Sequence, residues 1–333
     1  MVYNKYIGII GGTGTIGSII VKYLLQLQTH FHVLIGGRRS IKEISMSTFY
    51  NSERLKYNQM NYNNDVELDN FCSQCLLVIN AVGPSFKIND KIALHALRNN
   101  CHYIDIGGYG ILRDLLKPYE KSIEAQKLCF IIGVGWMPGI SGVFSKTIIE
   151  THLNSPENTN FNIYYGAVDN WSYSSTYDLA ASSMGKTRSY VYSHGKEIQV
   201  SPFRYTHHKF FPFIGHKKIC MPSFDEQLTQ LATSLKQIRK ISTFIMLNDY
   251  ISMGKFMFIK IFYKHNLNKA TLMLQDDYQR LVKKENKWGS VICQVSKIEP
   301  ERKIDTFYYL YTKNNLLYTA LPAVITTQYI LEG

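Results

Sequence analysis

The glycines near the start of the chain are the residues whose spacing points most directly to chemistry. A short apolar run at positions 7–10 leads into Gly12-x-Gly14-x-x-Gly17, and an apolar helix is predicted directly afterwards, over 19–27. A dinucleotide requires this arrangement, because one glycine makes the tight turn, a second lets backbone amides approach a pyrophosphate, and a third lets the helix pack closely on the strand. The positive end of the helix then faces the phosphates. The predicted contacts of this loop with a dinucleotide are Gly11, Gly12, Thr13, Gly14, Thr15 and Ile16.

The end of the second predicted strand distinguishes between the two nicotinamide cofactors. An NAD site places an acidic residue about 20 positions beyond the glycines, where it holds the ribose hydroxyls. Here the strand over 31–35 runs into Gly-Gly-Arg-Arg-Ser and carries no acid. A guanidinium group offers a 2′-phosphate a planar fork of donors, whereas a carboxylate would repel it. We therefore predict NADP(H), with Arg38 as the main contact of the 2′-phosphate. The alternative is that these arginines only form a solvated basic turn. The predicted 2′-phosphate contacts are Gly37, Arg38, Arg39 and Ser40.

Further polar and aromatic residues follow the later strands of the same predicted sheet. In parallel α/β sheets, ligands bind beyond the carboxyl ends of the strands. The fourth predicted strand ends near Asn80, the fifth near Asp105, and Trp136 follows the sixth. The cofactor contacts predicted here are Asn80, Ala81, Val82, Gly83, Asp105 and Trp136.

Hydride transfer requires the protein to place the reactants and to manage a proton. Reduction of an imine also gains from a nearby acid that keeps the nitrogen protonated. The predicted catalytic candidates are Asp105, Tyr109, Asp169 and Tyr177. Each position has a structural alternative: Asp105 can cap the following loop, Asp169 can close a strand-end turn, and Tyr177 can pack at an interface. Trp136 can likewise serve only to pack at the crossover between domains.

The cysteines and histidines give no metal-binding pattern. Cys72-x-x-Cys75 lacks the second half that a zinc site needs. His194 lies at a predicted hairpin tip, and the adjacent His207 and His208 face opposite ways on a strand. We therefore predict no metal. The chain also lacks the Gly-x-Ser-x-Gly elbow of many hydrolases.

Composition and charge narrow the class of partner. The 333-residue chain carries 37 Lys and Arg residues against 25 Asp and Glu residues, a formal charge of +12. The basic residues occur at most in small groups, such as Lys217-Lys218 and Lys283-Lys284, and no nucleic-acid-binding motif accompanies them. We interpret the excess as attracting an anionic cofactor and substrate rather than nucleic acid.

No segment of the sequence predicts export or a membrane span. The amino terminus enters its first strand without a secretory pattern. Lysines at 255, 260 and 264 interrupt the apolar stretch around 256–263, which falls short of the roughly 20 apolar residues that a span needs. We expect a cytoplasmic protein with six reduced cysteines and no membrane partner.

The first 138 residues alternate strands and helices, which is typical of a parallel sheet covered on both faces. After the first two strands, the predicted strands lie near 55–60, 76–82, 103–106 and 128–134, and the predicted helices near 89–99 and 112–126. Six strands with crossovers predict an α/β fold with a Rossmann-type, doubly wound parallel sheet, over residues 1–138.

The character of the sequence changes beyond Pro138. Tyrosine-rich, β-branched alternation predicts a second α+β domain on a mixed or antiparallel sheet, residues 139–312, for substrate binding and dimerisation. Its predicted strands are 161–168, 188–192, 288–297 and 306–312, and its predicted helices are 143–151, 224–238 and 269–283. Residues 313–333 contain an amphipathic helix, over 318–331, that we expect to return to the first domain.

Three segments together resemble the saccharopine dehydrogenase-like family of nicotinamide-dependent oxidoreductases. They are Asn-Ala-Val-Gly-Pro at 80–84, Cys-His-Tyr-Ile-Asp-Ile-Gly-Gly at 101–108, and Gly-Val-Gly-Trp-Met-Pro-Gly-Ile-Ser at 133–141. In that family the matching segments are an Asn-x-x-Gly-Pro loop on the nicotinamide side, a Tyr-x-Asp strand end and a Gly-x-x-Pro-Gly crossover. The resemblance covers residues 1 to about 145 and is thin afterwards.

The resemblance implies a two-domain dehydrogenase fold which, in the type enzymes, reduces an imine made from an amino acid and a carbonyl compound. The substrate-carboxylate arginines of those enzymes have no clear match here, so saccharopine itself is not the predicted substrate. The leading hypothesis is NADPH-dependent reduction of the C=N bond of an imine or cyclic imine in an amino-acid-derived or specialised metabolite. Two alternatives stay open: a trans-acting reductase of a C=C bond or carrier-bound intermediate in natural-product assembly, and an NADP(H)-sensing protein without turnover. The predicted partners are a small-molecule substrate, free or carrier-bound, and a second copy in a homodimer.

Overall fold

The computed structural model describes residues 5–27, 30–40, 52–108, 110–154, 156–184, 189–224, 226–263 and 265–332. The chain divides into two compact units: Met1–Gly139 with Leu316–Gly333, and Ile140–Asn315. For comparison, the sequence predicts boundaries after residues 138 and 312. Among the described residues, no helix combines the length and the apolar character that crossing a membrane requires.

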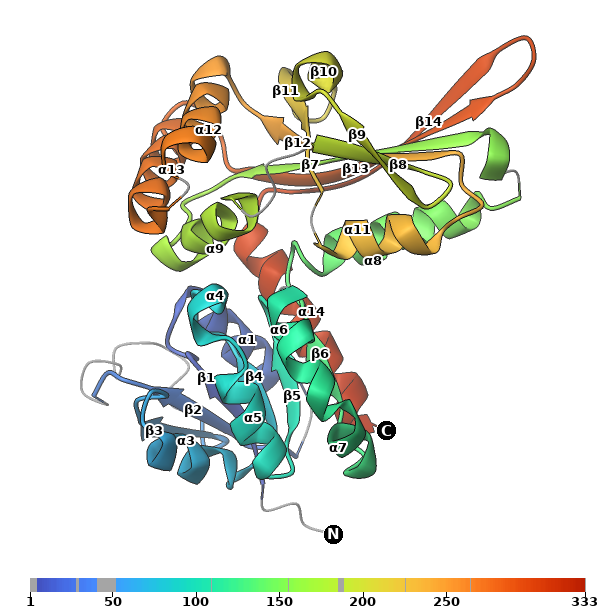
Figure 1. Ribbon diagram of the computed structural model, residues 1–333. Helices are drawn as coiled ribbons and strands as arrows, with labels where there is room; N and C mark the ends of the chain where they lie inside the picture. The colour runs from blue at the N-terminus through green and yellow to red at the C-terminus, as the bar shows by residue number, and fades with distance from the viewer. Residues whose placement is uncertain are drawn as a thin grey trace. The chain divides into compact units, whose positions relative to one another are not determined.

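The first unit is built on a six-stranded sheet in which each neighbouring pair of strands is parallel (Figure 1). The strand order is β3-β2-β1-β4-β5-β6. The strands are β1 Tyr6–Ile10, β2 Val33–Gly37, β3 Leu55–Gln59, β4 Cys75–Asn80, β5 His102–Asp105 and β6 Phe130–Ile132. The order reverses between β1 and β4, and dinucleotides bind at the carboxyl ends of the strands at such a switch point. The predicted doubly wound sheet is confirmed.

Helices cover both faces of this sheet. On one face, Phe71, Ile92 and Leu112 share a buried core with the sheet residues Val78 and Tyr103. On the other face, helix residues such as Ile20 and Ala323 pack against buried residues of β1, β2 and β4. Strands that are buried on both faces read as continuous apolar runs, which is why the sequence pattern identified them. The helices of the first face are α3 Asp65–Cys72, α5 Lys91–Arg98 and α6 Gly110–Leu116, those of the second face are α1 Thr15–Gln26 and α14 Asn315–Glu332, and the short helices are α4 Ser85–Ile88 and α7 Glu120–Ala125.

The second unit is built on an eight-stranded mixed sheet, as predicted. The strand order is β10-β11-β12-β7-β13-β14, in which β12 and β7 form the one parallel pair. Strand β8 pairs with β12 at Ile241 and also pairs with β9. The strands are β7 Thr159–Val168, β8 Ser189–Ser193, β9 Lys196–Val200, β10 His207–Phe211, β11 His216–Pro222, β12 Lys240–Leu247, β13 Trp288–Ile298 and β14 Lys303–Thr312.

Helices pack on both faces of the second sheet. Helices α8 and α11 lie on one face, whereas α12 and α13 lie on the other (Figure 1). Leu281 of α13 shares a buried cluster with Tyr164, Trp288 and Ile292 of the sheet. The helices are α8 Ile140–Thr151, α9 Tyr173–Met184, α10 Pro202–Tyr205, α11 Glu226–Ser234, α12 Tyr250–Phe262 and α13 Leu267–Val282, with 3-10 turns at Lys117–Tyr119 and Pro156–Asn158.

The structure departs from the predicted elements in a few places. The helix predicted over 112–126 is split: α6 ends at Leu116, a 3-10 turn contains Pro118, and α7 begins at Glu120. Proline removes a backbone donor and restricts the residue before it, which ends the helix there. The sequence pattern also missed β11, β12 and the helices α9 and α12. The predicted hairpin tip at His194 and the strand at His207 and His208 agree with the β8–β9 turn and with β10. Arg188, which belonged to the predicted strand over 188–192, lies outside the described residues.

An ion-pair network joins α12 to α13. Arg280 donates from Nη1 to Asp249 Oδ2 over 2.7 Å and from Nη2 to Asp249 Oδ1 over 3.0 Å, and it also pairs with Asp277. Asp249 additionally caps α12 by accepting a hydrogen bond from the backbone N–H of Ser252. Burial raises the pKa of Asp249, but the hydrogen bonds from Arg280 and Ser252 outweigh this effect and lower the pKa to about 2.

We expect Asp249→Asn to make the fold less dependent on pH in acid, because asparagine can still cap the helix but carries no charge. The folded pKa lies below the ordinary carboxyl value of 3.8, so ionised Asp249 stabilises the protein above that pH, and this stabilisation is lost as the pH falls through about 2. Urea unfolding at a series of pH values should show the wild type more stable than the variant near neutrality, with the difference shrinking in acid. A difference that stays constant down to pH 2 would contradict this assignment.

Candidate cofactor-binding site

The loop between β1 and α1 is packed too closely to accept side chains at its key glycines. Gly11 has a φ of +86°, a conformation that glycine adopts readily and other residues rarely do. A Cβ atom on Gly17 would collide with the carbonyl oxygen of Gly11, so Gly17 lets α1 approach the loop. The Gly14 N–H donates to the Gly11 carbonyl over 2.9 Å and closes the turn. The sequence expectation for these glycines therefore has a concrete steric basis.

The amino terminus of α1 is suited to an anion. Gly14 is its N-cap residue, and within residues 15–26, all of which are described, the first turn holds no acid; no side chain caps the helix. The first backbone N–H groups of a helix lack partners inside the helix and carry the positive end of its dipole. A pyrophosphate supplies the missing acceptors.

The tip of β2 lies beside this loop. A Cβ on Gly37 would lie 3.5 Å from the Oγ1 of Thr13. Side chains of β3 hold the tip by its carbonyl groups: the Tyr57 hydroxyl lies 2.9 Å from the Gly37 oxygen and 2.5 Å from the Arg39 oxygen. Gln59 Nε2 lies 3.3 Å from the Arg38 oxygen. The side chains of Arg38 and Arg39 are exposed, which suits them to contact a phosphate, and Ser40 is half-buried.

The segment after β4 packs against the glycine loop. A Cβ on Gly11 would lie 2.9 Å from Val82 Cγ2 and 3.0 Å from the carbonyl of Ala81. Asn80 shapes this turn, because its Oδ1 accepts a hydrogen bond from the Val82 N–H over 3.0 Å. Gly83 follows, and its peptide bond to Pro84 is cis. The fold thus brings together the residues predicted at the glycine loop, the β2 tip and the Asn80 turn.

Asp105 is the centre of a buried hydrogen-bond network at the end of β5. Asn80 and Asp105 face each other across β4 and β5, and Asn80 Nδ2 donates to Asp105 Oδ2 over 2.8 Å. The Tyr103 hydroxyl donates to the same oxygen over 2.6 Å. Only 2% of the Asp105 surface is exposed. Burial raises the pKa of Asp105, and the donors Tyr103 and Asn80 only partly offset this effect.

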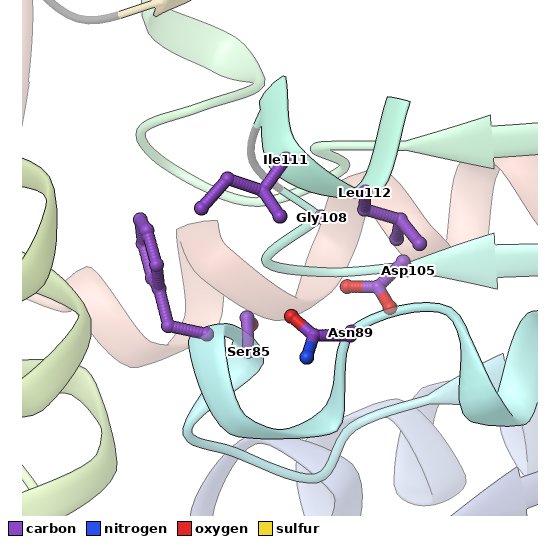
Figure 2. Close-up of a pocket in the computed structure, with 7 residues that line it drawn as sticks. Ser85, Asn89, Asp105, Gly108, Ile111 and Leu112 are labelled. Atoms are coloured by element: carbon purple, nitrogen blue, oxygen red, sulfur yellow. The ribbon is translucent and has the colours of Figure 1, made fainter. Parts of the chain in front are cut away.

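A small pocket lies against Asp105 (Figure 2). It is formed by residues that follow β4 and β5, with Ser85 and Asn89 on the side of α4 and Ile111 and Leu112 on α6. Figure 2 shows Asp105 between these two groups of residues. The pocket therefore adjoins the carboxyl ends of the strands at which the cofactor is expected.

Trp136 makes a packing contact. Its ring meets the ring of Tyr318 on α14 edge to face, with centroids 5.9 Å apart and planes at 89°. The indole is half-buried. This contact accords with the packing alternative, and a role for Trp136 at the cofactor stays a prediction.

The predicted catalytic residues fall into different parts of the molecule. Asp105 belongs to the first unit, whereas Asp169 and Tyr177 belong to the second. The Asp169 carboxylate is held by Lys287 Nζ at 2.8 Å and Asn315 Nδ2 at 3.2 Å, which agrees with the strand-end alternative. Tyr177 is buried within α9. Tyr109 lies outside the described residues.

Several contributors were assigned no role from the sequence, although Tyr103 belongs to the Tyr-x-Asp segment of the family resemblance. Tyr103 is buried and donates to Asp105, and its position two residues earlier on the same strand was a usable signal, because such residues share a face. Tyr57 and Gln59 hold the β2 tip through partners about 20 positions away, which a strand pattern does not reveal. Ser85 and Asn89 follow a proline loop and carried no distinguishing spacing.

The other chemically versatile side chains have structural environments. Burial raises the pKa of the Cys101 thiol to about 11, and its Sγ donates to the Cys72 carbonyl over 3.1 Å. Such thiols resist ionisation. Tyr192 and Lys196 have the Tyr-x-x-x-Lys spacing of the catalytic pair in short-chain reductases. They lie on the two strands of the β8–β9 hairpin, however, and not on one helix. In the described part of the chain, no three His, Cys, Asp or Glu side chains gather as metal ligands.

Comparison with known proteins supplies the class of this molecule. Residues 7–129 match the family model of the saccharopine dehydrogenase NADP binding domain. The fold is similar to apo saccharopine dehydrogenase (L-Glu forming) from Saccharomyces cerevisiae, with a TM-score of 0.67 and 14% identity, covering 99% of this chain and 92% of that one. It also resembles an engineered D-amino acid dehydrogenase bound to NADP+, with a TM-score of 0.48 and 11% identity over 98% of this chain and 91% of that one. No curated protein sequence matches the chain.

The fold and the glycine loop, together with the match of residues 7–129 to the NADP binding domain model, define an NADP-dependent oxidoreductase. More specifically, residues 7–129 match the model of the saccharopine dehydrogenase NADP binding domain, and the family resemblance found in the sequence is confirmed. NADP(H) is the cofactor. The residues present fit it: the glycines let α1 begin close behind β1 with no side-chain cap at its amino terminus, and the exposed guanidinium groups at the β2 tip suit a 2′-phosphate.

Two helix glycines form a matched test of the close approach. We expect Gly17→Ala to lower the free energy of unfolding by about 1–3 kcal/mol, because the new methyl group has no space, and to weaken NADP+ binding at least tenfold. A Cβ on Gly254 in α12 meets nothing within 4 Å, so Gly254→Ala should stabilise the protein by about 0.5–1 kcal/mol. Urea unfolding and calorimetric titration check both variants. Equal effects of the two substitutions would contradict the steric argument.

The β2 tip predicts a cofactor preference that one substitution can reveal. Loss of a charge-assisted hydrogen bond should make Arg38→Ala bind NADPH about 10- to 100-fold more weakly, while NADH binding stays unchanged. Fluorescence titration with both nucleotides measures the two affinities. Arg98→Ala, at an exposed position on α5, is the control and should alter neither. If Arg38→Ala weakened both nucleotides equally, the 2′-phosphate assignment would be wrong.

Proposed function

We propose that the protein is an NADPH-dependent reductase of the C=N bond of an amino-acid-derived imine or cyclic imine. The observation that carries the proposal is the combination of a saccharopine dehydrogenase NADP binding domain with a whole-chain fold similar to a saccharopine dehydrogenase over 92% of that chain. That relative is described as L-Glu forming, which supports a substrate built from an amino acid.

When bound, NADPH supplies a hydride. In the proposed reaction the imine carbon would accept this hydride as the C=N π bond breaks, and the imine nitrogen would take up one proton from solvent or from an acid, so that the products are an amine and NADP+. The protein then has to hold the cofactor, keep the imine nitrogen protonated and exclude competing water.

The first unit offers residues for these tasks. The glycine loop and the amino terminus of α1 bind the pyrophosphate, and Arg38 with Arg39 binds the 2′-phosphate. Of the catalytic candidates, Asp105 has the strongest support, because its raised pKa and buried position suit a group that manages a proton. Asp169 has weaker support, because its carboxylate already forms an ion pair with Lys287. The proposed roles of Tyr109 and Tyr177 rest on the sequence alone.

A substrate panel tests the proposal. NADPH absorbance is followed with amines and amino acids paired with α-keto acids or aldehydes, then with cyclic imines, and then with enoyl thioesters. We expect oxidation of NADPH only where a C=N bond is present, and for the pairs only when both components are added. The Gly17→Ala protein serves as the control and should oxidise NADPH more slowly than the wild type with every active compound when NADPH is subsaturating.

The other outcomes of the panel would each replace the proposal. Oxidation with enoyl thioesters alone would indicate a reductase of C=C bonds or of carrier-bound intermediates. Tight NADPH binding without oxidation of any compound would indicate a sensing protein. The homodimer, the cytoplasmic location and the use of the second unit for substrate binding and dimerisation are part of the proposal.

A further inference from the structure

One oxygen of the buried Asp105 carboxylate accepts no hydrogen bond of regular geometry from the described residues. Oδ2 accepts hydrogen bonds from Tyr103 and Asn80. Oδ1, by contrast, has no hydrogen-bond partner within the part of the chain that the structure describes. The backbone N–H groups of Gly107 and Gly108 lie near the carboxylate and lower its pKa, but they do not form a regular hydrogen bond with Oδ1. A buried acceptor without a donor is costly, and native proteins rarely leave one unused.

The pocket beside Asp105 offers that oxygen a route to a ligand. Asp105 lines the pocket together with Ser85, Asn89 and Leu112 (Figure 2). None of the lining residues that the structure describes is basic, so none of them supplies a cation to pair with the carboxylate. The pocket has room for about one water molecule. It therefore suits a single polar group at the end of a larger molecule, not a whole substrate.

The position of the pocket along the sheet edge indicates which molecule brings that group. Neighbouring strands lie about 4.8 Å apart, and the strand order places β2, β1, β4 and β5 in sequence. Arg38 at the tip of β2 is the predicted contact of the 2′-phosphate, and the glycine loop follows β1. A dinucleotide that extends in this direction reaches β4 and β5 with its nicotinamide half, after crossing the Ala81–Val82 backbone that packs on Gly11.

We infer that Asp105 Oδ1 is the acceptor of a subsite for one N–H or O–H donor at the reacting end of the bound ligands, with the nicotinamide half of the cofactor as its occupant. Tyr103 and Asn80 are positioning residues, because they hold Oδ2 and thereby turn Oδ1 toward the pocket. The expected donor is the ribose or the carboxamide of the nicotinamide half, and the test distinguishes this source from a second one, the protonated nitrogen of the substrate. The second source, unlike the first, rests on the proposed function.

The test compares two nucleotides on the full-length protein. Adenosine 2′,5′-bisphosphate has the adenosine and 2′-phosphate of NADP+ but lacks the nicotinamide half. Asp105→Asn keeps an oxygen for Tyr103 and Asn80 and replaces the free acceptor with a donor. We expect the variant to bind NADP+ about 10- to 100-fold more weakly and to bind the bisphosphate as the wild type does. Asp114→Asn, at an exposed carboxylate on α6, should change neither affinity.

A second variant guards against a folding defect in the first. Ile111 lines the pocket and is 46% exposed, so Ile111→Trp should narrow the pocket without disturbing the core, and should reduce NADP+ affinity but not bisphosphate affinity. If nucleotide binding is unchanged in both variants while KM for an active imine rises at least tenfold and kcat falls less, the subsite exists and takes the substrate nitrogen.

Two results would overturn the inference: no change in either nucleotide affinity or in KM, or an equal loss of affinity for both nucleotides. The binding comparison needs no turnover. A selective loss of NADP+ affinity therefore supports the subsite even if the imine panel is negative, and the failure of one proposal remains distinguishable from the failure of the other.

Discussion

The approach of α1 to the β1 loop is the constraint on which the rest of the first unit depends. Gly17 has no space for a Cβ next to the Gly11 carbonyl, so the helix begins close behind the strand and presents its positive end to the phosphates. The same loop contacts Ala81 and Val82 after β4, and Thr13 lies beside the β2 tip. A change in the distance between α1 and this loop would therefore displace all of these neighbours together.

The polar side chains at the strand ends act within a parallel sheet whose order fixes their neighbours. Asn80 meets Asp105 because β4 and β5 are adjacent and in register. Tyr103 meets the same carboxylate because alternate residues of one strand share a face. A buried carboxylate with two donors on one oxygen is rigid, since its remaining oxygen can point in only one direction. The sheet thus determines both the location of Asp105 and the orientation of its unpaired oxygen.

Most of the first unit could be predicted from the sequence, because strands buried on both faces give unbroken apolar runs and the glycine spacing has a steric cause. The second unit was harder to predict. Its strands pair over long separations, as β7 does with β12 and β13, and half-exposed strands such as β10 show mixed patterns. Asp169 is contacted by Lys287 and Asn315, which lie more than 100 residues away in the sequence. No local pattern indicates that this carboxylate already has an ion-pair partner, whereas Asp105 ends a clear predicted strand and is followed by a glycine pair.

Strand β3 holds the β2 tip through backbone carbonyl groups, so the conformation of that turn does not depend on which side chains it carries. Tyr57 and Gln59 reach the carbonyl groups of Gly37, Arg38 and Arg39, and every amino acid has a carbonyl group. Side chains at 38 and 39 can therefore be exchanged while the backbone keeps its course. On the predicted assignment of Arg38 and Arg39 to the 2′-phosphate, a lineage that came to depend on the other nicotinamide nucleotide would revise these exposed side chains and leave the supporting strand as it is.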